Sequence, residues 1–491
     1  MLADNDLLSI QQARILAENA AGAQKRLAAF PQCKLDEIVE AMADAVEQHA
    51  QELAVMSQEE TDYGCWQDKL RKNLFVCRQV RQALRGQVCV GVLPRGGDGS
   101  QFDVGVPLGV IVALSPVTSP VSTTVNTALL AVKTGNAVLF SPHPRAAHSI
   151  RRALEIMRGA AEQRGLPEGC LAWLDPVAKS GTEALFRHPV TSLILLTGVE
   201  GMLEAARRSG KPLIAGGTGN GPAFIERSAC LEQAVRDIIQ SKTFDNGLAP
   251  SAEQSIVVDA CVDAEVRRIL QQQGAYFMDQ AESCRVAALF FAPDGRRRKT
   301  AIGLSAAGLA RRADVKAPDH VRLLVADRKY VTPEDPYGRE LLAPVLAYYV
   351  EDDWLHACEK CIELLLNERN SHTLVVHSRD DEVIRQFALK KPVARLLVNT
   401  PAAFGGMGMT TTLFPAMTLG SGLAGRGITS DNVSPMNLVY IRRVGYGVRP
   451  APDAGQGGEA APSTIQEDRL RALHDVLREA IQVITATDRR G

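Results

Sequence analysis

The strongest constraint on the fold is a regular alternation of short apolar segments with helical segments in the first half of the chain. The apolar segments have the length of strands and span residues 106–114, 136–140, 171–174, 191–196 and 212–215. Segments with helical character separate them, such as the one from Ser149 to Gly165. Strands that alternate with helices of about 10–15 residues form βαβ units, whose parallel sheet is buried on both faces. The pattern therefore predicts an α/β fold.

A second alternation of the same kind runs from Glu232 to about residue 430. Its strand-like segments span residues 255–258, 323–325, 372–376 and 394–398. The first eighty residues are instead helical by pattern, because Ile38, Val39, Met42 and Val46 recur at helical spacing between polar residues. A chain of 491 residues is long enough for two or three packed units. We expect one unit for each alternation.

Composition excludes several classes of partner. The net charge is −1 with both signs interspersed, so no basic footprint for nucleic acid or an anionic membrane is present. No apolar run approaches the roughly eighteen residues of a membrane span, and the acidic N-terminus lacks the features of a secretory signal. Ten cysteines are scattered from Cys33 to Cys361 without a dense framework, which is typical of reduced thiols in the cytoplasm. Small molecules or proteins are the expected partners.

The end of the chain has a different texture. Residues 436–446 are expected to form a β-arm, and residues 448–463, rich in Pro, Gly and Ala, a flexible linker. From residue 464 an amphipathic helix follows, with an apolar stripe of Ile465, Leu470, Leu473, Leu477, Ile481 and Ile484. This helix either folds back on its own oligomer or docks onto a partner surface. Docking is favoured, because a local return does not need so long a linker.

Polar and glycine-rich segments follow the strands of the first alternation. They span residues 141–146, 197–201 and 216–222. Parallel sheets bind ligands at the carboxyl ends of their strands, often at helix N-termini. A ligand site is therefore expected at this edge.

These segments, together with residues 241–247, 252–255 and 399–401, resemble the aldehyde dehydrogenase superfamily. The likeness is to its CoA-acylating acetaldehyde and propionaldehyde branch, including enzymes of bacterial microcompartments and the dehydrogenase half of bifunctional aldehyde–alcohol dehydrogenases. It covers roughly residues 8–447. It implies two Rossmann-like αβα domains, an oligomerisation β-arm and a C-terminal amphipathic helix. The corresponding segments are 1–235 for NAD binding, 236–430 for catalysis, 431–447 for the arm, 448–463 for the linker and 464–491 for the helix.

The resemblance implies NAD as cofactor and CoA as co-substrate, with eight residues near the cofactor. In chain order, three lie near the adenosine and its ribose, two flank the pyrophosphate, two glycines allow close backbone approach, and a glutamate orients the nicotinamide ribose: Ser141, His143, Arg145, Thr197, Gly198, Gly217, Gly219 and Glu340. Any one of these glycines could equally be an ordinary turn residue, so the ordered set carries the interpretation. Residues 215–221 lack the glutamate base of the hydrolytic branch, which suits release of an acyl group to CoA.

Two residues depart from the family pattern where the reaction takes place. The position of the nucleophilic cysteine falls on Pro250, which has neither a thiol nor a main-chain N–H for an oxyanion. The position of the oxyanion-binding asparagine falls on Ser119, whose hydroxyl is shorter than an amide. Losing one oxyanion donor costs about a hundred- to a thousandfold in rate, and losing the nucleophile on the order of a millionfold. We therefore expect little or no acylating activity.

Other candidate nucleophiles are weaker. Ser251 follows Pro250, but in an extended segment it would face away from the nicotinamide, and no base is evidently placed to activate it. Cys261 lies too far along the chain. Cys358 and Cys361 have the spacing of a redox motif but lie within a helical pattern, so core packing is expected and no metal site.

Three hypotheses follow. In the first, the chain is a catalytically silent paralogue that forms a homodimer or tetramer, or co-assembles with an active subunit, in a microcompartment. In the second, it is an active acylating dehydrogenase with an unrecognised nucleophile or a hydrated aldehyde as substrate. In the third, it is a shell adaptor that uses only the arm and the terminal helix. We favour the first.

Overall fold

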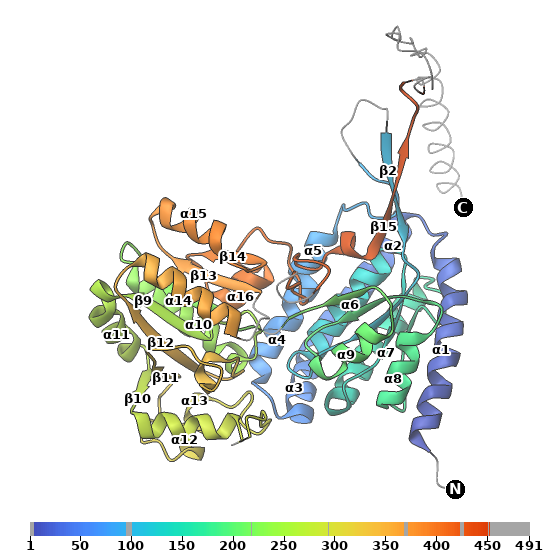
Figure 1. Ribbon diagram of the computed structural model, residues 1–491. Helices are drawn as coiled ribbons and strands as arrows, with labels where there is room; N and C mark the ends of the chain where they lie inside the picture. Colours follow the sequence, from blue (N-terminus) through green and yellow to red (C-terminus); the bar gives the residue numbers. More distant parts are fainter. Residues whose placement is uncertain are drawn as a thin grey trace. The chain divides into compact units, whose positions relative to one another are not determined.

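The computed structural model describes residues 4–94, 101–217, 219–292, 294–367, 372–422, 427–449 and 451 (Figure 1). The chain divides into two compact units, Met1–Gly91 with Val106–Tyr440, and Val92–Gly105 with Ile441–Gly491. The predicted helix at 464–491 and most of the linker at 448–463 lie outside the described residues, so both stay predictions.

Helices make up the first part of the chain, as its pattern indicates. Their bounds are α1 Asn5–Leu27, α2 Gln32–Gln48, α3 Ala50–Thr61, α4 Trp66–Phe75, the π-helix η1 Val76–Val80, and α5 Arg81–Leu84. In α2 the side chains of Ile38, Val39, Met42 and Val46 are buried, which confirms the helical spacing of its apolar residues. Among the described residues, no helix is long and apolar enough to cross a membrane.

The first alternation forms a five-stranded sheet in the order β5-β4-β3-β6-β7. The strands are β3 Val110–Leu114, β4 Ala137–Phe140, β5 Leu171–Trp173, β6 Thr191–Leu196 and β7 Leu213–Ala215, all parallel. The connecting helices are α6 Pro120–Lys133, η2 Pro144–Ala146, α7 Ala147–Gln163, α8 Lys179–Arg187, η3 Glu200–Met202 and α9 Leu203–Arg208. Strand order reverses at β3, and ligands of such sheets bind outside the carboxyl ends of the strands at this point.

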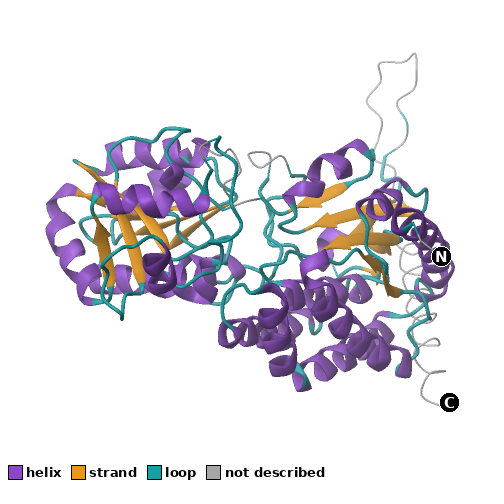
Figure 2. Cartoon of the chain, turned by 90° about the horizontal axis from the view of Figure 1, so that it is seen from below, coloured by secondary structure: helices purple, strands orange, loops and turns teal. Residues whose placement is uncertain are grey.

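The second alternation forms a seven-stranded sheet in the order β10-β11-β12-β9-β8-β13-β14. Its strands are β8 Pro222–Ile225, β9 Ser255–Asp259, β10 Ala275–Met278, β11 Leu323–Asp327, β12 Val345–Glu351, β13 Thr373–His377 and β14 Arg395–Val398, all parallel. Strand β8 lies in this sheet although it precedes residue 236, where the resemblance placed the start of the catalytic domain. Figure 2 shows helices on both sides of each sheet.

The remaining helices accompany the second sheet and the segment after it. They are α10 Leu231–Thr243, η4 Phe244–Gly247, η5 Ala260–Val262, α11 Asp263–Gln272, α12 Gln280–Phe290, α13 Ala306–Arg312, η6 Pro336–Gly338, α14 Trp354–Asn367, α15 Asp381–Lys390, α16 Ala402–Met407 and η7 Pro435–Leu438. The predicted helical pattern of Cys358 and Cys361 is confirmed, because both lie in α14 and are buried.

Residues 106–114, which the sequence predicts as one strand, belong to two. Strand β2, Gln101–Pro107, ends before Gly109, and β3 begins after it. Gly109 has φ +125°, a conformation that L side chains rarely adopt, and its N–H donates to Asn136 Oδ1 at 2.8 Å. The apolar pattern is continuous across this break because hydrophobicity does not report backbone direction.

A third, small sheet has the order β1-β2-β15, with β1 Gly91–Val92 and β15 Val439–Gly445. The rings of Phe102 on β2 and Tyr446 after β15 lie with centroids 6.3 Å apart. The strand β15 falls within the predicted arm, and the role of that arm in oligomerisation stays a prediction.

Candidate functional site

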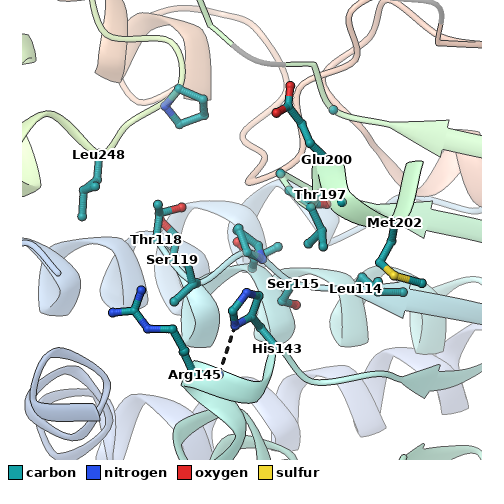
Figure 3. Close-up of a pocket in the computed structure, with 18 of the residues that line it drawn as sticks. Leu114, Ser115, Thr118, Ser119, His143, Arg145, Thr197, Glu200, Met202 and Leu248 are labelled. Carbon is teal, nitrogen blue, oxygen red and sulfur yellow. Dashed lines mark hydrogen bonds between the residues drawn. The ribbon is translucent and has the colours of Figure 1, made fainter. Parts of the chain in front are cut away.

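A cavity of about 580 Å³ lies at the carboxyl ends of the strands of the first sheet. Loops after β3, β4, β6 and β7 line it, and the turn around residues 248–250 and several side chains of the second αβ region complete its wall. Figure 3 shows Ser119, His143 and Thr197 converging on it from three of these loops. Its position is the one expected for a ligand site of a parallel sheet.

The cavity brings together most of the residues that the sequence singled out. Those that line it are Ser119, Ser141, His143, Arg145, Thr197, Gly198, Gly217, Pro250 and Glu340. Ser251 and Gly219 are not among the lining residues.

Two of the lining hydroxyls already have partners within the protein. Ser141 Oγ lies 2.8 Å from Thr182 Oγ1, and Thr197 Oγ1 lies 2.8 Å from Thr418 Oγ1. Because the Thr182 hydroxyl donates to Ala178 O at 2.9 Å, Ser141 is the donor in the first pair, whereas in the second pair one hydroxyl keeps its proton for a further acceptor. The pairs fix the side chains at the cavity wall without using all of their hydrogen-bonding capacity.

His143 and Arg145 line the cavity and also make hydrogen bonds within the protein. The Arg145 backbone N–H donates to His143 Nδ1 at 3.1 Å (Figure 3). The Arg145 guanidinium donates to Tyr63 Oη and Thr61 O, and it stacks on the Tyr63 ring. Burial lowers the pKa of His143, as do the positive charges of Lys299 and Arg145, so the imidazole is neutral at pH 7. Arg145 therefore anchors the end of α3 to the cavity.

Glu340 is a buried carboxylate at the cavity wall. Its Oε1 accepts from the Gly219 N–H at 2.8 Å, and its Oε2 lies 3.9 Å from an Arg297 nitrogen. A Cβ on Gly219 would lie 1.5 Å from the Pro250 carbonyl oxygen. Glycine at 219 is thus required by close packing against the Pro250 turn, a contact within the protein.

Pro250 and Ser251 occupy a turn and not an extended strand. Pro250 faces the cavity and carries no N–H. Ser251 is 3% exposed, and its Oγ donates to Ala403 O of α16 at 3.3 Å. The segment is therefore not extended as expected, but the Ser251 side chain still points away from the cavity, toward α16.

All ten cysteines lie within the described residues, and none lines the cavity. Cys65 lies two residues from the lining residue Tyr63; its Sγ donates to Asp68 Oδ2 at 3.1 Å, and burial raises its pKa to about 12. Cys261 is exposed in η5. Cys358 Sγ accepts from Lys391 Nζ at 2.6 Å inside the core. No group of metal-ligating side chains occurs in the described part of the chain.

The sequence did not reveal a buried network of charges beside the cavity. Lys72 lines the cavity, and its Nζ lies 2.9 Å from Ser119 Oγ and 2.7 Å from Asp245 Oδ2. Lys69 Nζ lies 3.1 Å from the same Asp245 oxygen. Lysines in an amphipathic helix usually form a solvated face, and the aspartate is distant in sequence. No local pattern could have paired them.

His372 is a further cavity residue that the sequence analysis did not single out. It lines the cavity, is 1% exposed, and contacts Thr373 Oγ1 through Nδ1 at 2.7 Å. Its Nε2 has no hydrogen-bond partner among the described residues. Burial, and then the charge of Arg395, lower its pKa to about 3, so the ring is neutral at pH 7. It is therefore a weak base.

Behind the Pro250 turn lie a buried lysine and glutamate that do not line the cavity. Lys242 Nζ donates to Gln254 Oε1 at 2.9 Å, and Glu253 Oε1 accepts from the Ala402 N–H at 2.9 Å. Burial lowers the pKa of Lys242 and raises the pKa of Glu253, each to about 7. Glu253 thus ties the turn to the start of α16, and Lys242 ties α10 to Gln254.

Comparison with known proteins places this geometry in context. Residues 3–288 match the aldehyde dehydrogenase family. A probable aldehyde dehydrogenase from Listeria monocytogenes EGD-e is 43% identical, with a TM-score of 0.89, over 91% of this chain and 99% of that chain. An acetylating aldehyde dehydrogenase from Geobacillus thermoglucosidasius is 39% identical, with a TM-score of 0.89, over 92% of this chain and 100% of that chain.

A curated relative is the bifunctional aldehyde-alcohol dehydrogenase of Escherichia coli K12. It is 33% identical over 441 residues, which cover 89% of this chain and 49% of the relative. The chain thus spans about half the length of the bifunctional curated relatives that it matches.

Proposed function

Because the chain belongs to the aldehyde dehydrogenase family, we propose that it is a catalytically silent relative of the CoA-acylating enzymes that retains the nucleotide site. The observation that carries the proposal is the turn at residues 248–251. It presents Pro250 to the cavity at the position that the resemblance assigns to the cysteine nucleophile.

The family reaction needs a thiolate that attacks the carbonyl carbon of the aldehyde. The thiohemiacetal then loses hydride to the cofactor, and CoA removes the acyl group. Pro250 offers no sulfur for the covalent bond and no N–H for the developing oxyanion. Either loss alone lowers the rate by a hundredfold or more.

Among the described residues, none of the candidate nucleophiles replaces the thiolate. Ser119 Oγ accepts a hydrogen bond from Lys72 Nζ, and that lysine is engaged in an ion pair with Asp245, so it is not a free base for the serine proton. Ser251 is bonded to Ala403 O, away from the cavity. Cys65 stays protonated because its pKa is raised to about 12.

The cavity fits a nicotinamide dinucleotide, which supplies a hydride acceptor when bound. Gly198 and Gly217 line it beside Thr197, and Gly198 has φ +60°, with the position of a Cβ 3.1 Å from Pro116 Cβ. Lys179 and Lys299 also line the cavity, and their positive charges suit a diphosphate. Glu340 is held in place by the Gly219 N–H, at the position that the resemblance gives to the ribose of the nicotinamide.

The experiment measures binding and turnover of the purified protein separately. NAD is titrated calorimetrically, and NADH formation is followed by absorbance with propionaldehyde and CoA present. We expect saturable NAD binding and no NADH above the protein-free control. Robust CoA-dependent NADH formation would show that the chain is an active enzyme. Failure to bind NAD would refute the retained nucleotide site.

A second candidate is CoA-independent oxidation of a hydrated aldehyde, with His372 as the base. It is favoured by one observation: His372 lines the cavity, and its buried Nε2 has no hydrogen-bond partner in the described part of the chain. In that reaction His372 Nε2 would take the hydroxyl proton of the diol, and a bound nicotinamide would supply the hydride acceptor that oxidation to the carboxylic acid needs. NADH formation without CoA, lost in His372→Gln, would support it. The pKa of about 3 argues against it, because so weak a base transfers little charge at pH 7.

We further propose that the chain acts through assembly. Tyr440 and Ile441 of β15 are exposed, as an oligomerisation arm requires. The sequence of residues 464–491 suits docking onto a microcompartment shell through its apolar stripe. Deleting residues 448–491 should abolish association with shells and leave the oligomeric state unchanged. Association that persists after the deletion would refute docking by the terminal segment.

A further inference from the structure

The charges beside Ser119 do not balance. Lys69, Lys72 and Asp245 are 3%, 1% and 0% exposed, and both ammonium groups share the single oxygen Asp245 Oδ2. The neighbouring Asp68 accepts from the Asp245 N–H and pairs with Arg71, which offsets its own charge. Two lysine amines therefore face a single carboxylate, and burial lowers the pKa of Lys69. An anion close by would stabilise the charged form of that lysine.

The Ser119 hydroxyl can donate a hydrogen bond into the cavity. The Lys72 ammonium has no lone pair, so in their 2.9 Å contact the lysine donates and Ser119 Oγ accepts. The serine side chain makes no capping bond to α6, although it stands at the N-cap. No acceptor for its O–H occurs in the described part of the chain, and the residue lines the cavity (Figure 3). Its hydroxyl is therefore polarised by a cation and free to donate.

Thr123 adds a second hydroxyl one helical turn later. It is 1% exposed and lines the cavity, and its Oγ1 has no hydrogen-bond partner among the described residues. Both residues line the same cavity, Ser119 at the N-cap of α6 and Thr123 in its first turn. Buried hydroxyls are almost always paired, so an unpaired one at a cavity wall points to a ligand. The positive end of the α6 dipole lies at the same place.

We infer that Ser119, Thr123 and Lys72 form a subsite for the carboxylate of a small organic acid or carboxylate-bearing aldehyde. Two hydroxyl donors match the two oxygens of a carboxylate, and the Lys72 ammonium supplies the opposite charge. Leu248, Ile302 and Val117 pack together along the lining and suit the short carbon chain of such a ligand. The subsite rests on the proposed function, since it names the ligand group that the silent cavity holds.

The electrostatics of the cluster agree with this assignment. Burial lowers the pKa of Lys69, and the positive charge of Lys72 lowers it further against the pull of Asp245. A carboxylate at Ser119 would offset that repulsion, whereas a neutral or cationic ligand would not.

The test compares propionate with propionamide, which has the same shape and no charge, by calorimetry at constant ionic strength without cofactor. We expect propionate to bind at least about tenfold more tightly than propionamide. Ser119→Ala should weaken propionate binding about tenfold and Thr123→Val about threefold, while propionamide binding stays unchanged. Ser122→Ala is the matched control, because Ser122 lies in the same turn of α6 but does not line the cavity, and its effect should be under twofold.

Three results would overturn the inference. They are equal affinity for propionate and propionamide, no measurable binding of propionate, or a Ser119→Ala protein that behaves like Ser122→Ala. Tighter binding of inorganic phosphate than of propionate would replace the carboxylate by a phosphoryl group and overturn the assignment as well. NAD binding is measured on every variant. If NAD binding persists while carboxylate binding is absent, the subsite is refuted and the proposed function is not.

Discussion

Two walls of the same cavity differ in what their residues can do. One wall, formed by α4 and the start of α6, presents Lys72 and the hydroxyls of Ser119 and Thr123, and Lys72 pairs with Asp245 of η4. The other wall, the turn of Leu248, Ala249 and Pro250, presents aliphatic groups and an imino ring. The first wall preserves a charged binding surface, while the second lacks the reacting group. Binding and covalent chemistry are therefore separable in this fold.

Restoring a thiol to the Pro250 turn tests the difference between the two walls with the largest expected effect. Pro250→Cys supplies a thiol and a main-chain N–H on the turn, so CoA-dependent NADH formation should rise about a thousandfold over background. Adding Ser119→Asn should raise it about tenfold further. Ser251→Cys is the matched control, because that side chain points to α16, and it should gain nothing. Equal gains from both cysteine variants would contradict the assignment of position 250.

The charged wall should matter most to stability. Asp245→Asn leaves two buried lysines without their shared carboxylate, so the free energy of unfolding should fall by about 3–5 kcal/mol. Denaturant titration measures it. Glu37→Gln breaks an exposed pair with Lys34 and should cost less than about 1 kcal/mol. A loss at Asp245 as small as that at Glu37 would show that the network does not hold the wall together.

The aliphatic wall depends on close backbone packing. Gly219→Ala places a Cβ against the Pro250 carbonyl oxygen, so the turn must shift, and the protein should lose about 3 kcal/mol of stability. Gly22→Ala is the control, since nothing lies within 4 Å of its Cβ in the exposed part of α1, and it should gain about 0.5–1 kcal/mol. Thermal unfolding of both variants measures the difference. An unaffected Gly219→Ala protein would mean that the turn is not tightly packed.

The smallest effect concerns a buried histidine remote from both walls. Burial lowers the pKa of His377 to about 4, below its unfolded value of about 6.5. Its contribution is present above pH 6.5 and is lost as pH falls toward 4, at about 1.4 kcal/mol per pH unit. His377→Gln should flatten the stability profile between pH 6 and 4.5 by that slope. His356→Gln, at an exposed site where Asp353 raises the pKa, should not flatten it.

The parallel sheets follow from the sequence wherever an apolar run is bounded by turn residues. Strand β6 has the bounds that its pattern predicts, Thr191–Leu196. Strand β8 escaped notice because Pro222 and the preceding glycines are typical of a loop, while its burial comes from pairing with β9 and β13. Local pattern identifies a strand, and the sheet that receives it is decided by distant partners.

The site follows the same rule. The family motifs alone predicted that Pro250, Ser119 and Glu340 belong to one site, and all three line the cavity. Lys72 could not be found, since it is joined to Asp245 across 173 residues and only the folded chain shows the pair buried. Nor does sequence show that Arg145 is held by Tyr63, or that Gly219 packs on Pro250. Such contacts depend on tertiary packing.

No cysteine is among the described residues that line the cavity, so the natural chain should form no covalent acyl intermediate. Intact-mass spectrometry after incubation with propionyl-CoA, without cofactor, tests it directly, with Pro250→Cys as the positive control. We expect the unmodified mass for the natural chain and a propionyl adduct for the variant. A stoichiometric propionyl adduct on the natural chain, mapped to a residue that lines the cavity, would contradict the account.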